Sequence, residues 1–170
     1  MDFQILRKLK RRVWRPMAAL PCAAGLALVA SPLSAQAAPA GCTGPASATW
    51  IDVAVEGVQN ANGLIAITLY ADNSRKFLAK HGSLYVGRVD ARAGTTTGCI
   101  FVPRSGVYAI AVYHDEDADQ KFNRTGLGLP AEGFGFSNNP STLAGLPTFK
   151  SVRLSIPRAG LVTRIRLRYP

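Results

Sequence analysis

The stretch Val107–Asp119 constrains the fold most, because a continuous strand pattern runs straight into a cluster of acids. Its first seven residues, Val107–Tyr113, are all apolar or aromatic and are rich in types that favour strands. Such a strand has no polar face for water and needs packing on both sides, as the central strand of a β-sandwich has. Four acidic residues then end the pattern, and we expect them on a connection at the edge of a sheet: Asp115, Glu116, Asp117 and Asp119.

Six further segments carry strand patterns, separated by short turns that contain glycine, asparagine or proline. They are residues 49–57, 63–70, 84–91, 95–102, 148–156 and 161–169. Segment 72–81 begins with a residue type that caps helices, and it predicts at most one or two helical turns. The sequence therefore predicts an all-β fold, an antiparallel β-sandwich of the immunoglobulin or prealbumin kind with about seven strands.

Residues 1–37 have the composition of a secretory signal peptide. Six basic residues precede Met17, and an uncharged run of fourteen residues, 17–30, follows them. Ala35 and Ala37 supply the small residues that a signal peptidase needs before the cut. A run of fourteen residues is short for a membrane-spanning helix, which needs about 20. We therefore expect an exported protein, periplasmic or secreted, whose mature part is a single domain, residues 38–170, without a transmembrane span.

The cysteines fit this export route. Cys22 lies within the predicted signal peptide, so that Cys42 and Cys99 are the two that remain in the mature chain. Paired cysteines in an exported protein usually form a disulfide. The sequence therefore predicts a bond that ties the start of the mature chain to the strand around Cys99.

The net charge of the whole chain, +10, overstates how basic the folded domain is. Residues 38–170 keep fourteen of the twenty basic residues and nine of the ten acidic ones, which leaves a net charge of +5. These basic residues are scattered and form no stripe interleaved with aromatic side chains, so the pattern is not that of a nucleic-acid-binding protein. The partner that we expect is an envelope component or a small ligand.

Few residues in the mature chain could carry catalysis. It has two histidines, His81 and His114, and no Gly-x-Ser-x-Gly motif for a nucleophile. Two distant histidines and a paired set of cysteines do not make a zinc site. We therefore assign no catalytic residue. A small hydrolase or isomerase that uses His114 and the adjacent acids stays open as the alternative.

The acidic stretch has the spacing of a calcium-binding loop, in which every second residue points an oxygen inward. The candidate ligands, at positions 1, 3, 5, 7 and 9 of that pattern, are Asp115, Asp117, Asp119, the carbonyl of Lys121, and Asn123. Gln120 stands where such loops have glycine, and Gly126 where they have a bidentate glutamate, a part that Glu132 could take from further along. The cofactor that we expect is therefore either none or a weakly bound Ca²⁺, and the alternative is a solvated acidic turn.

Three segments resemble a bacterial family catalogued as domain of unknown function 2141. They are Tyr108–Asp117 (YAIAVYHDED), Gly128–Asn139 (GLPAEGFGFSNN) and Leu146–Phe149 (LPTF). The resemblance spans roughly residues 51–167 and implies an exported sandwich domain, but it brings no established activity. Gln120 and Asn123 stand where the family usually has glycine and aspartate.

The polar residues around the Gly128–Asn139 segment are expected to structure loops through hydrogen bonds from side chains to the backbone. They are His114, Glu132, Ser137 and Asn138. With no catalytic set in view, the sequence favours an exported, non-enzymatic binding or structural module of the bacterial cell envelope.

Overall fold

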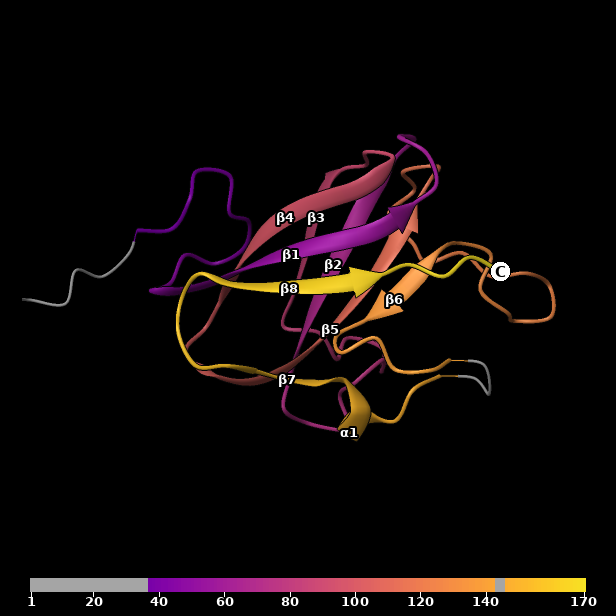
Figure 1. Ribbon diagram of the computed structural model, residues 1–170. Helices are drawn as coiled ribbons and strands as arrows, with labels where there is room; N and C mark the ends of the chain where they lie inside the picture. The colour runs from indigo at the N-terminus through magenta and orange to yellow at the C-terminus, as the bar shows by residue number, and fades with distance from the viewer. Residues whose placement is uncertain (1–36, 143–145) are drawn as a thin grey trace, which may run out of the picture. The chain divides into compact units, whose positions relative to one another are not determined.

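The computed structural model describes residues 37–142 and 146–170, which form eight strands and one short helix (Figure 1). The elements are β1 (Thr49–Val58), β2 (Leu64–Ala71), β3 (Tyr85–Asp90), β4 (Gly94–Val102), β5 (Gly106–Asp115), β6 (Phe134–Phe136), α1 (Phe149–Val152), β7 (Arg153–Ile156) and β8 (Leu161–Arg166). The prediction of an all-β fold is confirmed. The predicted signal peptide lies, up to Gln36, outside the described residues.

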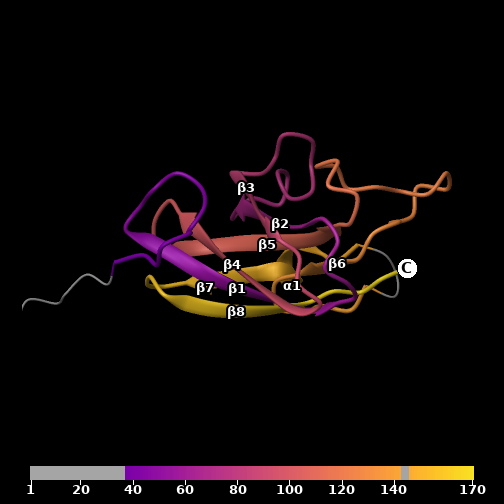
Figure 2. The same cartoon turned by 90° about the horizontal axis from the view of Figure 1, so that it is seen from above.

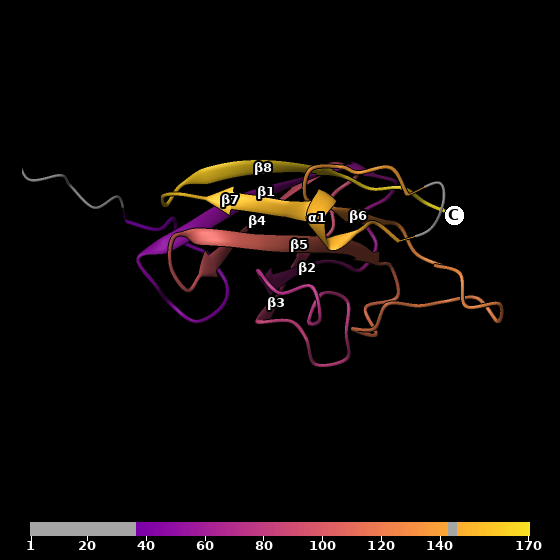
Figure 3. The ribbon, with the colours of Figure 1, turned by 90° about the horizontal axis from the view of Figure 1, so that it is seen from below.

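The strands form two sheets that lie in separate layers (Figures 2 and 3). One sheet has the order β4-β1-β8, and the other has the order β3-β2-β5-β6 with β7 also paired to β5. The alternating apolar residues of the facing strands fill the space between them, as in a β-sandwich. Ile51, Ile67 and Ile110, which come from β1, β2 and β5, are all fully buried in this core.

Strand β5 is the central strand of the larger sheet. On one side it pairs with β2 from Ala71↔Tyr108 to Leu64↔Asp115, which is the whole length of β2. On the other side its first half pairs with β7 and its second half with β6. Both faces of the strand are covered, because Ile110 packs in the core between the sheets and Ala109 packs in a second apolar cluster on the other side. Asp115, at the last position of the strand, is buried as well.

The disulfide between Cys42 and Cys99 is present, with the two Cα atoms 4.4 Å apart, and confirms that prediction. Thr43 supports the bond from the next position, because its N–H donates to the Cys99 carbonyl and its carbonyl accepts from the N–H of Phe101, each at 2.9 Å. The segment before β1 is therefore fastened to β4 both covalently and by backbone hydrogen bonds. Among the residues that the structure describes, no helix is long and apolar enough to cross a membrane.

Three details differ from the sequence prediction. Strand β8 pairs parallel to β1, from Ile51↔Leu161 to Glu56↔Arg166, although all other paired strands are antiparallel. Residues 149–152, expected to be strand, form a single helical turn before β7. Segment 72–81 forms turns and not a helix, and its Phe77 packs edge-on against Tyr70 at a ring distance of 5.3 Å.

Candidate cation site

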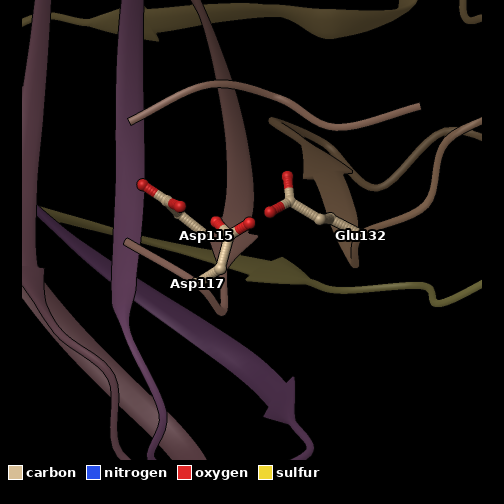
Figure 4. A group of neighbouring side chains, drawn as sticks. All are labelled: Asp115, Asp117 and Glu132. Atoms are coloured by element: carbon tan, nitrogen blue, oxygen red, sulfur yellow. The ribbon is translucent and has the colours of Figure 1, made fainter. Parts of the chain in front are cut away.

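Three carboxyl groups meet at the end of β5. Asp115 is its last residue, Asp117 lies in the turn that follows, and Glu132 comes from the segment just before β6. Each contributes a carboxylate oxygen to a group whose atoms all lie within 4.8 Å of one another (Figure 4). We call these three residues the acidic triad. Asp115 and Glu132 are 17 positions apart and are brought together because β6 pairs beside β5.

Asp115 is the least solvated member, with none of its surface exposed. Its Oδ2 accepts the N–H of Gln120 at 3.0 Å, whereas Oδ1 has no hydrogen-bond partner within residues 37–142 and 146–170. Burial raises the pKa of this carboxyl, and the neighbouring carboxylates of Asp117 and Asp119 raise it further, against the opposing effect of the Gln120 N–H. A buried carboxylate oxygen without a donor is an unfavourable arrangement that a bound cation would relieve.

Glu132 is also buried, with 6% of its surface exposed. Its Oε2 accepts the backbone N–H of Asn123 at 3.0 Å, which leaves the carboxyl close to the other two acids. Burial raises its pKa, and the charges of Asp115 and Asp117 add to that rise, while the Asn123 N–H lowers it. Carboxylates held this close repel one another when all are ionised, so the group is poised for either protons or a metal ion.

The other predicted ligands are engaged with the loop itself. Asp119 is not part of the triad: its Oδ1 accepts the N–H of Lys121 at 2.7 Å, and its Oδ2 lies 3.6 Å from the same residue's Nζ. Asn123 donates from Nδ2 to Asp117 Oδ2 at 3.0 Å. The structure therefore gathers Asp115 and Asp117 with Glu132, and not with Asp119 as the regular spacing of the loop predicted.

Gln120 occupies the position at which calcium loops have glycine. It adopts a left-handed backbone conformation with φ of 65°, and Ala118 does the same with φ of 57°. Residues with a Cβ rarely take this conformation, at a cost of roughly 1–2 kcal/mol each. The turn is thus as sharp as the one that glycine normally allows, and the Gln120 N–H points back at the Asp115 carboxylate.

His114 is fully buried and joins three separate parts of the chain. Its Nε2 lies 2.8 Å from the carbonyl oxygen of Asn62, and its Nδ1 lies 2.8 Å from the hydroxyl of Tyr169. A carbonyl only accepts, so Nε2 donates to it, while Nδ1 and the tyrosine hydroxyl share the second hydrogen bond. The Tyr169 hydroxyl in turn accepts the N–H of Gln59 at 3.1 Å. We call this network the His114 clamp; it holds the β1–β2 turn and the C-terminal segment against β5.

Replacing Tyr169 with phenylalanine should lower the free energy of unfolding by about 1–3 kcal/mol, because it leaves the buried His114 Nδ1 without its hydrogen-bond partner. Urea denaturation of the purified variant measures this. Tyr108→Phe is the comparator, since it removes one hydrogen bond, to the Arg104 carbonyl, and should cost only about 0.5–1.5 kcal/mol. Equal effects in the two variants would contradict a special role for the clamp.

The segment Ser137–Asn139 connects neighbouring elements through its side chains. The Ser137 hydroxyl is fully buried between the Ile110 backbone and the Val152 carbonyl. Asn138 donates to the carbonyls of Ser151 and Arg153. Asn139 donates to the Arg164 carbonyl and accepts the N–H of Arg166, so that it covers the free edge of β8. These bonds join β5, α1, β7 and β8 around the loop that follows β6.

Two members of this region could not be predicted as partners of His114. Asn62 acts through its backbone carbonyl, which any residue supplies. Tyr169 lies in phase with the buried Leu167 in segment 161–169, so the alternation indicates an inward-facing side chain but not its bond to the histidine. Glu132 could be suggested only as a distant substitute ligand, because strand β6, which positions it, has three residues and is too short to give a periodic pattern.

The donor atoms gathered in this region are of the kind that a hard cation takes. The triad offers oxygen ligands alone, and the ring nitrogens of the one neighbouring histidine are both occupied. Hard divalent cations, above all Ca²⁺, prefer such carboxylate and carbonyl oxygens.

Comparison with known proteins supplies the family and nothing on activity. No curated protein and no solved structure matches the chain. The family model described as "Uncharacterized protein conserved in bacteria (DUF2141)" matches residues 53–163, which run from the middle of β1 into β8 and include the acidic triad, the buried His114 and the Ser137–Asn139 connector. The chain belongs to this bacterial family, DUF2141.

Proposed function

We propose that this protein is an exported, non-enzymatic β-sandwich module of the bacterial cell envelope that binds Ca²⁺ at the acidic triad. One observation carries the proposal: Asp115 is wholly buried beside two further carboxyls, and its Oδ1 lacks any donor in the described part of the chain. Acidic clusters on a surface are stable in water without a metal. A buried carboxylate oxygen without a partner is what a cation would complete.

The donor set favours Ca²⁺ over other divalent cations. Zinc and the later transition metals favour nitrogen and sulfur, which the triad does not supply. Magnesium demands a near-octahedral cage and gives up its waters reluctantly, whereas calcium accepts irregular sets of carboxylate and carbonyl oxygens. A triad assembled from a strand end, a turn and a separate segment is irregular in this way. We expect a weak site, with Kd of about 10⁻⁴–10⁻³ M, as in extracellular modules.

Export is supported by two independent features. The disulfide between Cys42 and Cys99 is of a kind that persists in oxidising compartments. The first 37 residues have the order of a signal peptide, with basic residues, an apolar run and Ala35 and Ala37 before the cut. Millimolar calcium is available outside the cytoplasm, which suits a site of low affinity.

The alternative function, a hydrolase or isomerase built on His114 and the adjacent acids, has less to support it. A general base must reach the proton that it removes. His114 is fully buried, and its two ring nitrogens face Asn62 and Tyr169. This geometry favours a structural role for the histidine, and no second observation favours turnover.

Calcium at tenfold excess over its Kd should stabilise the protein by about 1.4 kcal/mol, a rise of several degrees in Tm, because it binds only the native fold. Asp117→Asn should abolish this rise. It removes a ligand charge from the exposed member of the triad and leaves the core intact. Differential scanning calorimetry with Ca²⁺ and with a chelator measures both.

Two further variants sharpen this test. Asp119→Asn should keep most of the calcium-induced rise in Tm, because Asp119 lies outside the triad. If this variant lost the rise, the regular calcium-loop pattern would be favoured instead. Asp52→Asn makes the same chemical change on β1, in the other sheet, and should behave as wild type. If calcium leaves the Tm of the wild type unchanged at 10-fold excess over the expected Kd, the proposed function fails.

The pH dependence has a defined sign. The pKa values of Asp115 and Glu132 are raised in the fold, so ionising them as the pH rises through those values costs the native state stability. Bound calcium would remove that cost. The calcium-induced rise in Tm should therefore be largest near neutral pH and should shrink as the pH falls and protons compete for the same oxygens.

A further inference from the structure

The segment between Asp117 and Glu132 projects from the sheets as a narrow hairpin, drawn in orange (Figures 2 and 3). Its arms meet in an isolated bridge between Arg124 and Pro130. Its tip is closed by hydrogen bonds from the Thr125 N–H and to the Thr125 carbonyl, each 2.8 Å long. Gly128 takes a φ of 78° at the turn, with open space around it. The projection is therefore an ordered element of the fold.

The hairpin tip exposes large apolar side chains. Leu127 is 89% exposed and Leu129 is 61% exposed, which makes them the two most exposed large hydrophobic residues in the part of the chain described. Leucines on a core-facing turn would be covered, and solvent-facing turns normally carry polar residues. Two neighbouring leucines held out on a projecting turn indicate an apolar partner.

The apolar surface continues behind the hairpin. A cavity of about 250 Å³ lies between the hairpin base and the outer face of β5 and β6, and Tyr113, Phe122 and Phe134 line it. The rings of Tyr113 and Phe122 are 5.4 Å apart, and those of Phe122 and Phe134 are 6.1 Å apart. Two other exposed leucines, Leu78 and Leu146, also line this cavity. Four of the six exposed large hydrophobics thus lie on this hairpin or around the hollow beside it.

The charges on the hairpin are of one sign. Residues 120–131 contain Lys121 and Arg124 and no acid. The Lys121 side chain is 77% exposed, and the Arg124 guanidinium lies 5.1 Å from the centre of the Phe122 ring. Apolar residues at a tip, with cations and the aromatic rings of Tyr113, Phe122 and Phe134 behind them, match the layers of a bilayer surface, from hydrocarbon to headgroup.

We propose that the hairpin 124–130 is a membrane-docking element that inserts Leu127 and Leu129 into a bilayer rich in anionic phospholipid. Lys121 and Arg124 then lie at the level of the phosphate groups, and the three aromatic rings beside the hairpin lie at the interface. A stable protein interface covers about 800 Å² on each partner with complementary shape. The narrow tip with its two leucines offers a far smaller contact area. Two leucines on a narrow turn can instead enter the boundary between the headgroups and the acyl chains of a bilayer.

The calcium dependence of membrane docking rests on the proposed function of the acidic triad. Residues 115–132 carry five acidic and two basic residues, a formal charge of −3 that opposes an anionic surface. Bound Ca²⁺ would reduce it to −1. Glu132 belongs to the triad, and its bond to the Asn123 N–H fixes the base of the hairpin. Calcium would therefore both reduce repulsion from the membrane and hold the hairpin in place.

Sedimentation with lipid vesicles tests the proposal on the mature, disulfide-bonded protein. With calcium, the wild type should bind vesicles of phosphatidylglycerol mixed with phosphatidylethanolamine, and should bind phosphatidylcholine vesicles more weakly. The double variant Leu127→Ser/Leu129→Ser should bind the anionic vesicles at least about tenfold more weakly, because the two buried side chains supply the apolar transfer free energy. Val162→Ser removes an equally apolar residue, 56% exposed on β8, and should bind as wild type.

The remaining outcomes separate this inference from the calcium proposal. If the double variant keeps the calcium-induced rise in Tm but no longer binds vesicles, the result supports both the cation site and the docking hairpin. If vesicle binding depends on the leucines but not on calcium, and calcium does not raise the Tm of the wild type, the docking hairpin is supported and the proposed cation site is overturned. No binding by the wild type, or equal binding by the double variant, overturns the docking hairpin. Capture of an envelope protein through the same leucines, without vesicle binding, would overturn it in favour of a protein partner.

Discussion

The double variant Cys42→Ala/Cys99→Ala should lose about 4 kcal/mol of unfolding free energy, because the bond closes a loop of 57 residues. In the loop-entropy model the cross-link acts mainly on the unfolded chain, whose freedom it limits. The total stability of a domain of this size is about 5–15 kcal/mol, so the loss is a large part of the whole. Urea denaturation of the oxidised wild type and the double variant measures the difference.

Reduction supplies the matched control. The wild type in dithiothreitol should fall to the stability of the double variant, and the double variant should not respond to the reductant. Thr43 should retain its backbone bonds to β4 in both cases, because they do not depend on the sulfur atoms. A difference below about 1 kcal/mol would mean that the segment before β1 contributes little beyond those bonds, against the model of loop entropy.

Local pattern predicts which segments become strands here, and it fails where pairing is decided by distant partners. The seven predicted strands all appear, because period-two alternation reflects burial on one face of a sheet. The parallel pairing of β8 with β1 could not be predicted, since nothing within residues 161–169 specifies a neighbour or its direction. Residues 149–152 look like strand because Phe149 and Val152 are apolar. Both instead pack from a helical turn into an apolar cluster that also contains Tyr70, Phe77 and Phe136.

The candidate site shows the same division. Asp115 and Asp117 are neighbours in the chain, and their alternate spacing predicts a shared direction toward a cation. Glu132 joins them only because β6 pairs with β5, which is a tertiary fact. The complete burial of Asp115 was not predictable either, because the acidic run around it indicates solvent, and Asp117 and Asp119 are indeed exposed.

Gly63, in the turn before β2, should tolerate no side chain. It has a φ of +63°, and a Cβ there would overlap the Asp115 carbonyl oxygen and crowd the backbone of Glu116. Gly63→Ala should therefore destabilise the fold by about 2–5 kcal/mol, of which about 1–2 kcal/mol is backbone strain and the rest is overpacking. Thermal and urea denaturation measure the loss.

Gly94 provides a control that separates the two causes. It also has a positive φ, of +84°, but nothing lies within 4 Å of a Cβ built on it. Gly94→Ala should cost only the backbone strain, about 1–2 kcal/mol. Because Gly63 presses against Asp115 and Glu116, relief of the overlap must move the backbone that carries the triad, so that Gly63→Ala should also weaken the calcium-induced rise in Tm while Gly94→Ala leaves it intact. Equal losses of stability in the two variants would show that the β1–β2 turn does not pack tightly against the end of β5, and the cation site would then lack the rigid support that its geometry implies.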